Sequence, residues 1–264
     1  MDDAIASDTA IAREWDGNAE SWAAAVRSGR DLYREHFNSP AFLHFIGDVE
    51  GKMLLDAGCG EGYNTRILAR AGARVTGVAI SERMITRAQE EERRVPLGIH
   101  YQAASFTELS VFGVDSFDAV VSFMALMDGA DLDTVVREIA RVLRPGGELF
   151  FSVLHPCFVT QGFGWLYDEA GREVALRVGG YFDTRPYIDH WHFEGMIEHP
   201  DFSVPRFPRT LSQYVNAVTT SGLRLQQIEE PRPTEAACER FPWLERWREH
   251  AALFLYIRAS KDRT

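Results

Sequence analysis

The most constraining feature of this 264-residue sequence is a glycine-rich loop that follows a short apolar run. Residues 54–62 read Leu-Leu-Asp-Ala-Gly-Cys-Gly-Glu-Gly, so an acid precedes three glycines at alternate positions. Glycine lets the backbone turn sharply and approach a ligand closely. We expect a strand before this loop and a helix after it, over residues 63–70. That order is typical of the ligand crevice in an open α/β sheet.

The rest of the chain supports such a sheet, because strand-length apolar runs alternate with amphipathic segments. Seven strands are expected, at residues 53–55, 74–80, 99–103, 117–123, 148–154, 223–228 and 251–259. Helices are expected between them, at residues 63–70, 82–94, 131–143 and 210–222, with a short helical segment at 243–250. Thr210 and Gln213 form a capping-box pattern at the start of the helix at 210–222. We predict an α/β fold with a doubly wound, seven-stranded, mostly parallel sheet.

The chain is expected to form one domain, residues 1–264, built of four parts. Residues 1–50 have a helical apolar stripe and form an N-terminal cap. Residues 51–154 form the ligand-binding core, and 155–209 interrupt the strand–helix rhythm without a clear period. Residues 210–264 complete the sheet.

Composition narrows the function classes. The formal net charge of −11 repels a phosphate backbone, which disfavours a nucleic-acid partner. Cys59, Cys157 and Cys238 are far apart and form no pair with zinc-ligand spacing. The acidic N-terminus lacks a signal-peptide pattern, and no apolar run is long enough to cross a membrane. We therefore expect a cytoplasmic protein with no metal, no nucleic-acid partner and no membrane partner.

Two further motifs join the glycine loop. Residues 117–122 read Phe-Asp-Ala-Val-Val-Ser, and residues 141–147 read Arg-Val-Leu-Arg-Pro-Gly-Gly. The Arg-Pro-Gly-Gly at 144–147 predicts a turn. A phosphate-binding loop usually reads Gly-x-Gly-x-x-Gly, whereas here the third glycine comes one residue early. The acid at Asp56 suits a cationic amino-acid group better than a pyrophosphate. A plain β–α turn and a dinucleotide site remain the alternatives for the loop alone.

Together the three motifs resemble class I S-adenosylmethionine-dependent methyltransferases of the small-molecule (type 11) group, and the match extends over residues 50–154. The resemblance implies S-adenosylmethionine as cofactor, with its amino-acid end at the glycine loop and its sulfonium near Ser122 and Phe123. Tyr33 would close over the cofactor, or is an ordinary helix tyrosine. The implied cofactor-binding residues are Tyr33, Asp56, Gly58, Cys59, Gly60, Gly62, Ala79, Ile80, Ser81, Ser105, Phe106, Ser122 and Phe123.

The sequence departs from this family at two acids. Members usually carry an acid at the end of the second strand, where it grips both ribose hydroxyls, but Ala79 stands there. They often carry another near the adenine amino group, where this chain has Ser105. Losing a hydrogen bond to a charged group weakens binding by about 10- to 100-fold. Ser81 or Glu82 could partly compensate at the ribose.

Methyl transfer is a direct displacement that needs an aligned nucleophile and often a base, but no metal. His155 directly follows the fifth strand and is the first candidate for a catalytic base or substrate-orienting group. Alternatively, His155 shapes the exit from that strand. His190 and His192 would share a face of a strand. They could bind a metal or an aromatic substrate, although surface histidines are the simpler interpretation.

The insertion at 155–209 is dense in aromatic residues, as expected of a lid over an apolar or aromatic substrate. A small satellite core or a homodimer contact would use the same residues. These are Phe158, Phe163, Trp165, Tyr167, Tyr181, Phe182, Tyr187 and Trp191. Met124, Met127 and Asp128 follow the fourth strand and are expected to border the same pocket, or simply to pack there.

The predicted function is therefore methyl transfer from S-adenosylmethionine to O, N or C of a small, apolar or aromatic metabolite. The alternative is a methyltransferase-like binding or regulatory protein with a degenerate cofactor site. An RNA methyltransferase is disfavoured by the acidic charge.

Overall fold

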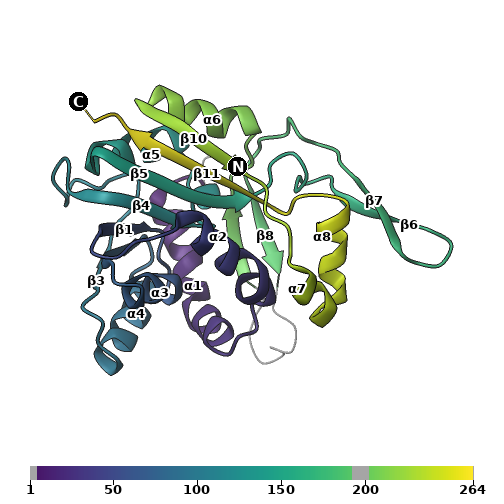
Figure 1. Cartoon of the computed structure of the whole chain (residues 1–264), viewed down its shortest axis with the longest axis horizontal. Coiled ribbons are helices and arrows are strands. Elements are labelled where there is room, and N and C mark those ends of the chain that lie inside the picture. Colours follow the sequence, from purple (N-terminus) through teal and green to yellow (C-terminus); the bar gives the residue numbers. More distant parts are fainter. Residues whose placement is uncertain (1–4, 192–201, 264) are drawn as a thin grey trace.

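A seven-stranded sheet forms the centre of this computed structural model, which describes residues 5–191 and 202–263. The strands lie in the order β10-β11-β5-β4-β1-β2-β3 (Figure 1). Neighbours are parallel except at β11, which runs antiparallel between β10 and β5. This confirms the predicted doubly wound, mostly parallel sheet. The strands are β1 Met53–Ala57, β2 Arg74–Ala79, β3 His100–Ala103, β4 Phe117–Phe123, β5 Leu143–Leu154, β10 Leu223–Glu229 and β11 Phe254–Lys261.

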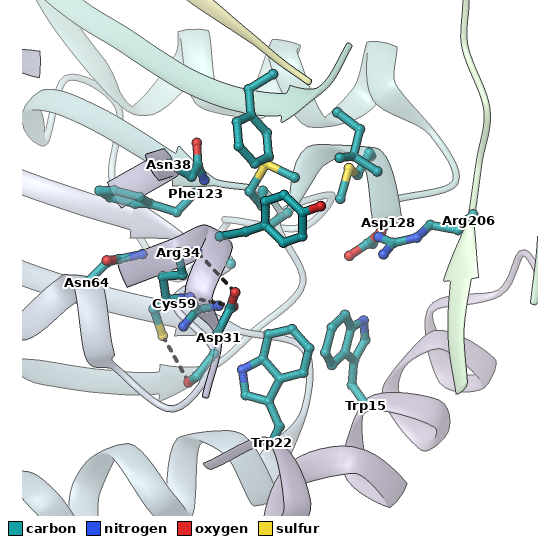
Figure 2. A pocket seen from close by; sticks show the side chains of 18 of the residues that line it. Trp15, Trp22, Asp31, Arg34, Asn38, Cys59, Asn64, Phe123, Asp128 and Arg206 are labelled. Atoms are coloured by element: carbon teal, nitrogen blue, oxygen red, sulfur yellow. Dashed lines mark hydrogen bonds and ion pairs between the residues drawn. The ribbon is translucent and has the colours of Figure 1, made fainter. Parts of the chain in front are cut away.

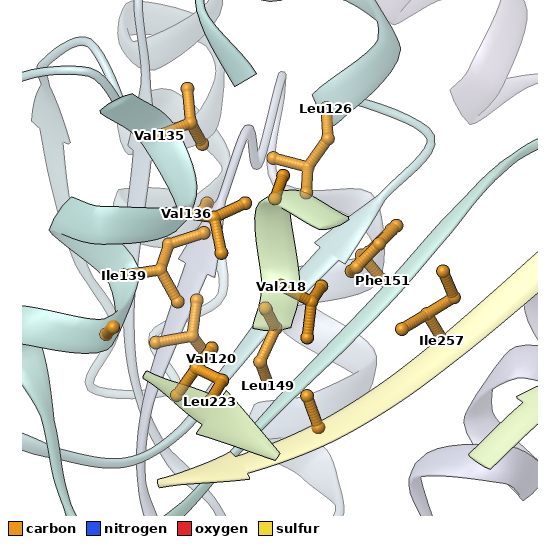
Figure 3. Packing of buried hydrophobic residues seen from close by; sticks show 14 of the residues in the cluster. Val120, Leu126, Val135, Val136, Ile139, Leu149, Phe151, Val218, Leu223 and Ile257 are labelled. Carbon is orange, nitrogen blue, oxygen red and sulfur yellow. The ribbon is translucent and has the colours of Figure 1, made fainter. Parts of the chain in front are cut away.

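Helices cover both faces of the sheet, because each connecting segment has one apolar side. Helices α5 (Leu132–Val142) and α6 (Leu211–Thr220) pack on one face, where Val136, Ile139 and Val218 meet the strand side chains (Figure 3). Helices α2 (Ser39–Ile46), α3 (Tyr63–Arg70) and α4 (Glu82–Arg94) contribute to the core on the other face. The predicted capping box of α6 is present: the side chains of Thr210 and Gln213 each bond to the other's backbone N–H.

The Arg-Pro-Gly-Gly segment differs from its prediction. We expected a turn at 144–147 and a strand from Glu148, but β5 already begins at Leu143. The pairing with β4 jumps from Phe117–Leu143 to Ala119–Glu148, so the intervening residues bulge out of the ladder. Gly146 has a φ of 80°, which suits glycine. The segment is therefore an irregular strand start.

The N-terminal residues lie across the carboxyl edge of the sheet. Helix α1 (Asp8–Arg27) is followed by a short π-helix, η2 (Arg34–Asn38), and by α2. Helix α1 contacts the start of α4 through Asp16, and the side chain of Asn18 exchanges two hydrogen bonds with the backbone of Ser203. These contacts fix α1 as one wall of the crevice.

The insertion contains two hairpins that its aperiodic sequence did not indicate. Strands β6 (Gly164–Tyr167) and β7 (Glu173–Arg177) form one, which extends away from the sheet (Figure 1). Strands β8 (Tyr187–Trp191) and β9 (Phe202–Arg206) form the other, and β9 packs on α1.

The predicted helical segment near 243–250 is confirmed, and another helix precedes it. These elements are α7 Glu235–Arg240, the 3₁₀ turn η4 Pro242–Leu244 and α8 Glu245–Glu249. Within the described ranges, no helix is long and apolar enough to cross a membrane.

Candidate active site

A large cavity of about 920 Å³ opens at the carboxyl ends of β1, β2, β3 and β4. It lies at the upper end of the roughly 300–1,000 Å³ usual for small-molecule sites, as expected of a site for two ligands. Figure 2 shows Trp15 and Trp22 of α1 on one side of it, and Asn38 and Phe123 on the opposite side. The cavity therefore forms between the N-terminal helices and the sheet edge.

The glycine loop lines this cavity and is held tightly at its start. The amides of Gly58 and Cys59 both donate to the carbonyl of Val78, at 2.8 and 2.9 Å. Gly58 has a φ of 90°, and a Cβ placed there would lie 2.3 Å from the Cβ of Ala125. Gly60 also has a positive φ, 56°, but open space surrounds it. The first glycine is thus required by close packing, and the second faces the cavity.

Asp56 has the most unusual environment of the loop. Its side chain is 1% exposed and lines the cavity. One carboxylate oxygen, Oδ2, accepts a 2.6 Å hydrogen bond from Thr65, whereas Oδ1 has no partner. Burial raises the pKa of Asp56 to about 7, against the lowering effects of Thr65 and Arg34. An unpaired buried carboxylate oxygen beside a cavity suits a cationic ligand group.

A cation of the protein lies close to this acid. Arg34 of η2 lines the cavity, 3.2 Å from Asp31 and 3.8 Å from the buried Glu61. Its guanidinium also lies 5.4 Å from the ring centre of Trp22 (Figure 2) and 5.8 Å from that of Tyr63. The loop end of the cavity therefore offers both a free carboxylate oxygen and a guanidinium. These are the two groups that an amino acid's ammonium and carboxylate would meet.

At the end of β2, Ala79, Ile80 and Ser81 line the cavity. Ser81 caps α4 by accepting from the Met84 amide, and it donates its hydroxyl proton to Asp16 at 2.6 Å. Its single proton is thereby used. The Ser81 oxygen keeps one further lone pair, so partial compensation by Ser81 as an acceptor for a ribose hydroxyl stays a prediction.

The structure brings most of the predicted cofactor residues to this cavity. Gly62 and Ser122 are the two that do not line it. Gly62 caps α3 with a φ of 87°, and a Cβ there would lie 2.5 Å from the hydroxyl of Tyr101. Ser122 is buried and donates to the carbonyl of Ala57 at 2.7 Å. Both residues shape the β1 edge. Those that line the cavity are Tyr33, Asp56, Gly58, Cys59, Gly60, Ala79, Ile80, Ser81, Ser105, Phe106 and Phe123.

His155 is placed differently from the base we expected. It does not line the cavity and is only 2% exposed. Its Nδ1 accepts from the Cys157 amide at 3.2 Å, so Nε2 carries the proton and donates to Glu230 at 2.7 Å. Burial lowers the pKa of the imidazole. Its catalytic role stays a prediction, and these contacts favour the alternative in which His155 shapes the strand exit.

The other end of the cavity is walled by aromatic rings. From the insertion, Phe163 and Trp165 line it, and Trp243 and Trp247 reach it from the C-terminal segment. Trp165 and Trp247 pack edge to face at 4.9 Å. Tyr33 packs edge to face on Trp243 at 4.6 Å and lies 3.3 Å from the indole nitrogen of Trp247. Tyr33 therefore belongs to this aromatic wall.

The remaining aromatics of the insertion lie elsewhere. Phe182 and Tyr167 are exposed, at 84% and 59%. The ring of Phe158 packs at a tilt against that of His155, with ring centres 4.6 Å apart, and the hydroxyl of Tyr181 accepts from the Leu211 amide. Tyr187 lines a separate small pocket. Only part of the insertion therefore faces the cavity, and the side chain of Trp191 lies outside what the structure describes.

Asp128, which follows β4, is a further buried acid that lines the cavity. Asp128 is 5% exposed and pairs with Arg206 of β9 at 2.5 Å (Figure 2). Burial raises its pKa to about 6, with Arg206 opposing the shift. Arg206 is shared with Asp189 at 3.4 Å. Met124 and Met127 border the cavity beside it, as expected.

Among the described residues, no cluster of three candidate metal ligands occurs. His190 of β8 bonds to Ser203 at 3.1 Å. His192 lies outside the described residues.

Sequence reasoning missed the contributions of the N-terminal helices and the C-terminal segment. Arg34, Asp8, Trp15 and Trp22 precede the motif-bearing core, and Arg246 follows it by almost a hundred residues. The apolar stripe of α1 predicted a buried helix but not which sheet edge it covers. The π-helix that carries Arg34 is a local irregularity of the kind found at functional sites, but it is visible only in the structure.

Comparisons with known proteins agree with this geometry. A family model described as a methyltransferase domain matches residues 55–151. A ubiquinone biosynthesis O-methyltransferase from Coxiella burnetii is 33% identical over 73% of this chain and 74% of its own length. Proteins of that name from other strains of this organism match over 54% of the chain and 60% of their own length.

Solved structures show the same relationship. An S-adenosylmethionine-dependent methyltransferase from Mesorhizobium loti is 29% identical, with a TM-score of 0.68 over 84% of this chain and 96% of that one. A 1,6-didemethyltoxoflavin-N1-methyltransferase from Burkholderia thailandensis was solved with S-adenosylhomocysteine bound. It shares the fold at 17% identity and a TM-score of 0.53, over 93% of this chain and 88% of that one.

Proposed function

Because this chain belongs to the class I S-adenosylmethionine-dependent methyltransferases, we propose that it methylates a hydroxyl oxygen on a flat, apolar or aromatic small molecule. The observation that carries this proposal is the pairing of an aromatic-walled chamber with one buried carboxylate, Asp128, inside the cofactor cavity.

The loop end of the cavity fits the cofactor. The unpartnered Oδ1 of Asp56 would accept from its ammonium group, and Arg34 would pair with its carboxylate. Gly60 leaves open space beside them. When bound, S-adenosylmethionine supplies a methyl group made electrophilic by a sulfonium. Phe123, at the end of the neighbouring strand β4, faces the same space.

The aromatic end fits the acceptor. Trp165, Trp243 and Trp247 present ring faces and edges that suit a planar molecule. Arg246 lines the same region, lies 5.3 Å from the ring centre of Trp165, and has a buried Nε without a partner. This chamber positions the acceptor next to the methyl donor, which is the main catalytic requirement of a displacement.

We assign Asp128 as the group that accepts the proton of the acceptor hydroxyl. A phenolic hydroxyl has an ordinary pKa near 10. A carboxylate with a pKa of about 6 is ionised at neutral pH and can accept that proton as the oxygen attacks. The new C–O bond forms as the C–S bond breaks. The proton moves to Asp128, and Arg206 stays beside it to favour the return of the charged form.

The test is a product assay with S-adenosylmethionine and a panel of small phenols and catechols, matched by anilines of the same shape. Mass spectrometry identifies the methylated product and its position. We expect phenols to be methylated, and we expect Asp128→Asn to lower kcat by about 10²- to 10⁴-fold. The affinity of this variant for S-adenosylhomocysteine should equal that of wild type, because Asp128 is not among the residues that we assign to the cofactor at the glycine-loop end of the cavity.

His155→Gln is the matched comparison, because His155 is the rival base. If the loss of kcat falls on His155→Gln and spares Asp128→Asn, the assignment of Asp128 is wrong. If the anilines are methylated and the phenols are not, the proposed acceptor atom is wrong.

A further inference from the structure

The far end of the cofactor cavity, beyond β2 and β3, has a polar cluster that the glycine loop and the aromatic chamber do not explain. Ser105 and Phe106 line it from the segment after β3, and Asp8 and Ile11 line it from the first turns of α1. A Cβ on Gly129 would lie 2.5 Å from the ring of Phe106, so this ring packs closely on the backbone of Gly129. A carboxylate from the N-terminal helix thus joins Ser105 at this end of the cavity.

The hydrogen bonds of this cluster have a fixed direction. Thr107 donates its hydroxyl proton to Oδ2 of Asp8 at 2.8 Å, since a carboxylate has no proton to give. Ser105 must then donate to the Thr107 hydroxyl, 2.7 Å away. The Ser105 oxygen accepts from the Thr107 amide at 3.1 Å. Every side-chain proton of the cluster is therefore already used.

What the side chains of the cluster have left is acceptor capacity alone. Ser105 and the carboxylate of Asp8 keep lone pairs, and among the described residues no lysine or arginine pairs with Asp8. A ligand that binds here must therefore bring hydrogen-bond donors. The cofactor carries such a donor at the end opposite its amino acid, namely the exocyclic amino group of adenine.

We propose that Asp8 accepts a hydrogen bond from the adenine amino group and so makes the site selective for adenine over its deaminated form. Ser105 and Thr107 are positioning residues, because they aim and hold the carboxylate. Asp8 replaces, from a different part of the chain, the acid that the segment after β3 lacks. The ammonium group, at the opposite end of the cofactor, is recognised separately by the unpartnered Oδ1 of Asp56.

Helix α1 is docked firmly enough to serve this role. Asp16 accepts hydrogen bonds from the Ser81 hydroxyl at 2.6 Å and from the Arg83 amide at 3.1 Å, and it lies eight residues, or about two turns, along the same helix from Asp8. Asn18 bonds to Ser203 of β9. Adenine recognition therefore depends on α1 being in place.

The experiment compares two ligands by isothermal titration calorimetry with the full chain. S-adenosylhomocysteine carries the amino group, and S-inosylhomocysteine has a carbonyl oxygen in its place. We expect wild type to prefer S-adenosylhomocysteine by about 10-fold or more, as for a hydrogen bond to a charged group. Asp8→Ala should weaken binding of S-adenosylhomocysteine about 10- to 100-fold and leave S-inosylhomocysteine nearly unaffected.

Two further variants control for folding and charge. Asp133→Asn removes an acid from the first turn of another helix, α5, and should bind both ligands as wild type does. Thr107→Val keeps Asp8 but removes the hydroxyl that holds it, and should reduce the preference between the ligands by a smaller factor. Thermal melting of each variant reports whether it is folded.

Two results would overturn the inference. One is an unchanged ligand preference in a folded Asp8→Ala variant, and the other is an equal loss of affinity for both ligands. Failure of wild type to bind S-adenosylhomocysteine at all would instead contradict cofactor use by this chain, so the two failures are distinguishable.

Discussion

Cofactor binding should weaken steeply as the pH falls from 8 to 6, because Asp56 must be ionised to accept the cofactor's ammonium group. Burial raises the pKa of Asp56 to about 7 in the free protein, and one of its oxygens has no partner. A bound cation would favour the carboxylate and lower that pKa. At pH 8 the site is mostly ready to bind, whereas at pH 6 about nine molecules in ten must first lose a proton. The dissociation constant should then rise about tenfold.

Calorimetry of S-adenosylhomocysteine binding across this pH range measures the effect. Repeating the titration at pH 7 in buffers of different ionisation enthalpy counts protons, and binding should release about half a proton there. Glu61 is the other buried acid at the loop end, and burial raises its pKa as well. Asp56→Asn should bind S-adenosylhomocysteine weakly, with an affinity that does not change with pH. Glu61→Gln should keep the pH dependence of wild type. Asp128→Asn is the control outside the loop end and should keep that pH dependence as well.

The same pKa shift predicts an opposite effect on stability. A carboxyl group whose folded pKa lies above its unfolded value of 3.8 destabilises the fold increasingly as the pH rises between the two values. Without ligand, Asp56→Asn should therefore be more stable than wild type at pH 8, by up to about 4 kcal/mol, and similar to it below pH 4. An affinity that is constant from pH 8 to 6, or a slope that persists in Asp56→Asn, would refute the assignment of Asp56.

Two substitutions test the walls of the cavity. Ala79→Asp should tighten S-adenosylhomocysteine binding about 10-fold by supplying a ribose acceptor at the end of β2, with Ala79→Asn giving less. Calorimetry that shows equal or weaker binding would contradict this. Gly58→Ala should lower the free energy of unfolding by about 1–3 kcal/mol more than Gly60→Ala, because only the first would place a Cβ 2.3 Å from that of Ala125. Equal denaturation midpoints would contradict it.

The core of the fold was predictable from local sequence because each signal lies within one β–α unit. The loop at 54–62 and the strand at 117–123 carry their apolar runs and glycines in consecutive residues. The same holds for the helix boundaries at Thr210 and Gly222. The Arg-Pro-Gly-Gly segment shows the limit of such signals. Its residues predict an irregular backbone correctly, but pairing with β4 decides that the irregularity lies inside a strand.

The substrate end was less predictable, because its parts come together only through long-range packing. Trp165 and Trp247 meet across more than eighty residues of sequence, and Asp128 meets Arg206 across 78. No spacing rule relates such pairs. The aromatic density at 155–209 indicated a chamber. However, Phe182 and Tyr167 contribute to that density and are exposed, so the density alone does not tell which aromatic residues face the cavity.

The structure replaces only one of the two acids that are missing, at Ala79 and at Ser105. At Ser105 the carboxylate of Asp8 arrives from α1 and joins the cavity wall through Thr107. Near Ala79, the carboxylate of Asp16 is directed to Ser81 and the start of α4 and does not line the cavity. The adenine end is therefore provided for, while the ribose end remains short of an acceptor. This is why Ala79→Asp should gain affinity and Asp8→Ala should lose it, and why the two effects should be additive, as for sites that share no partner.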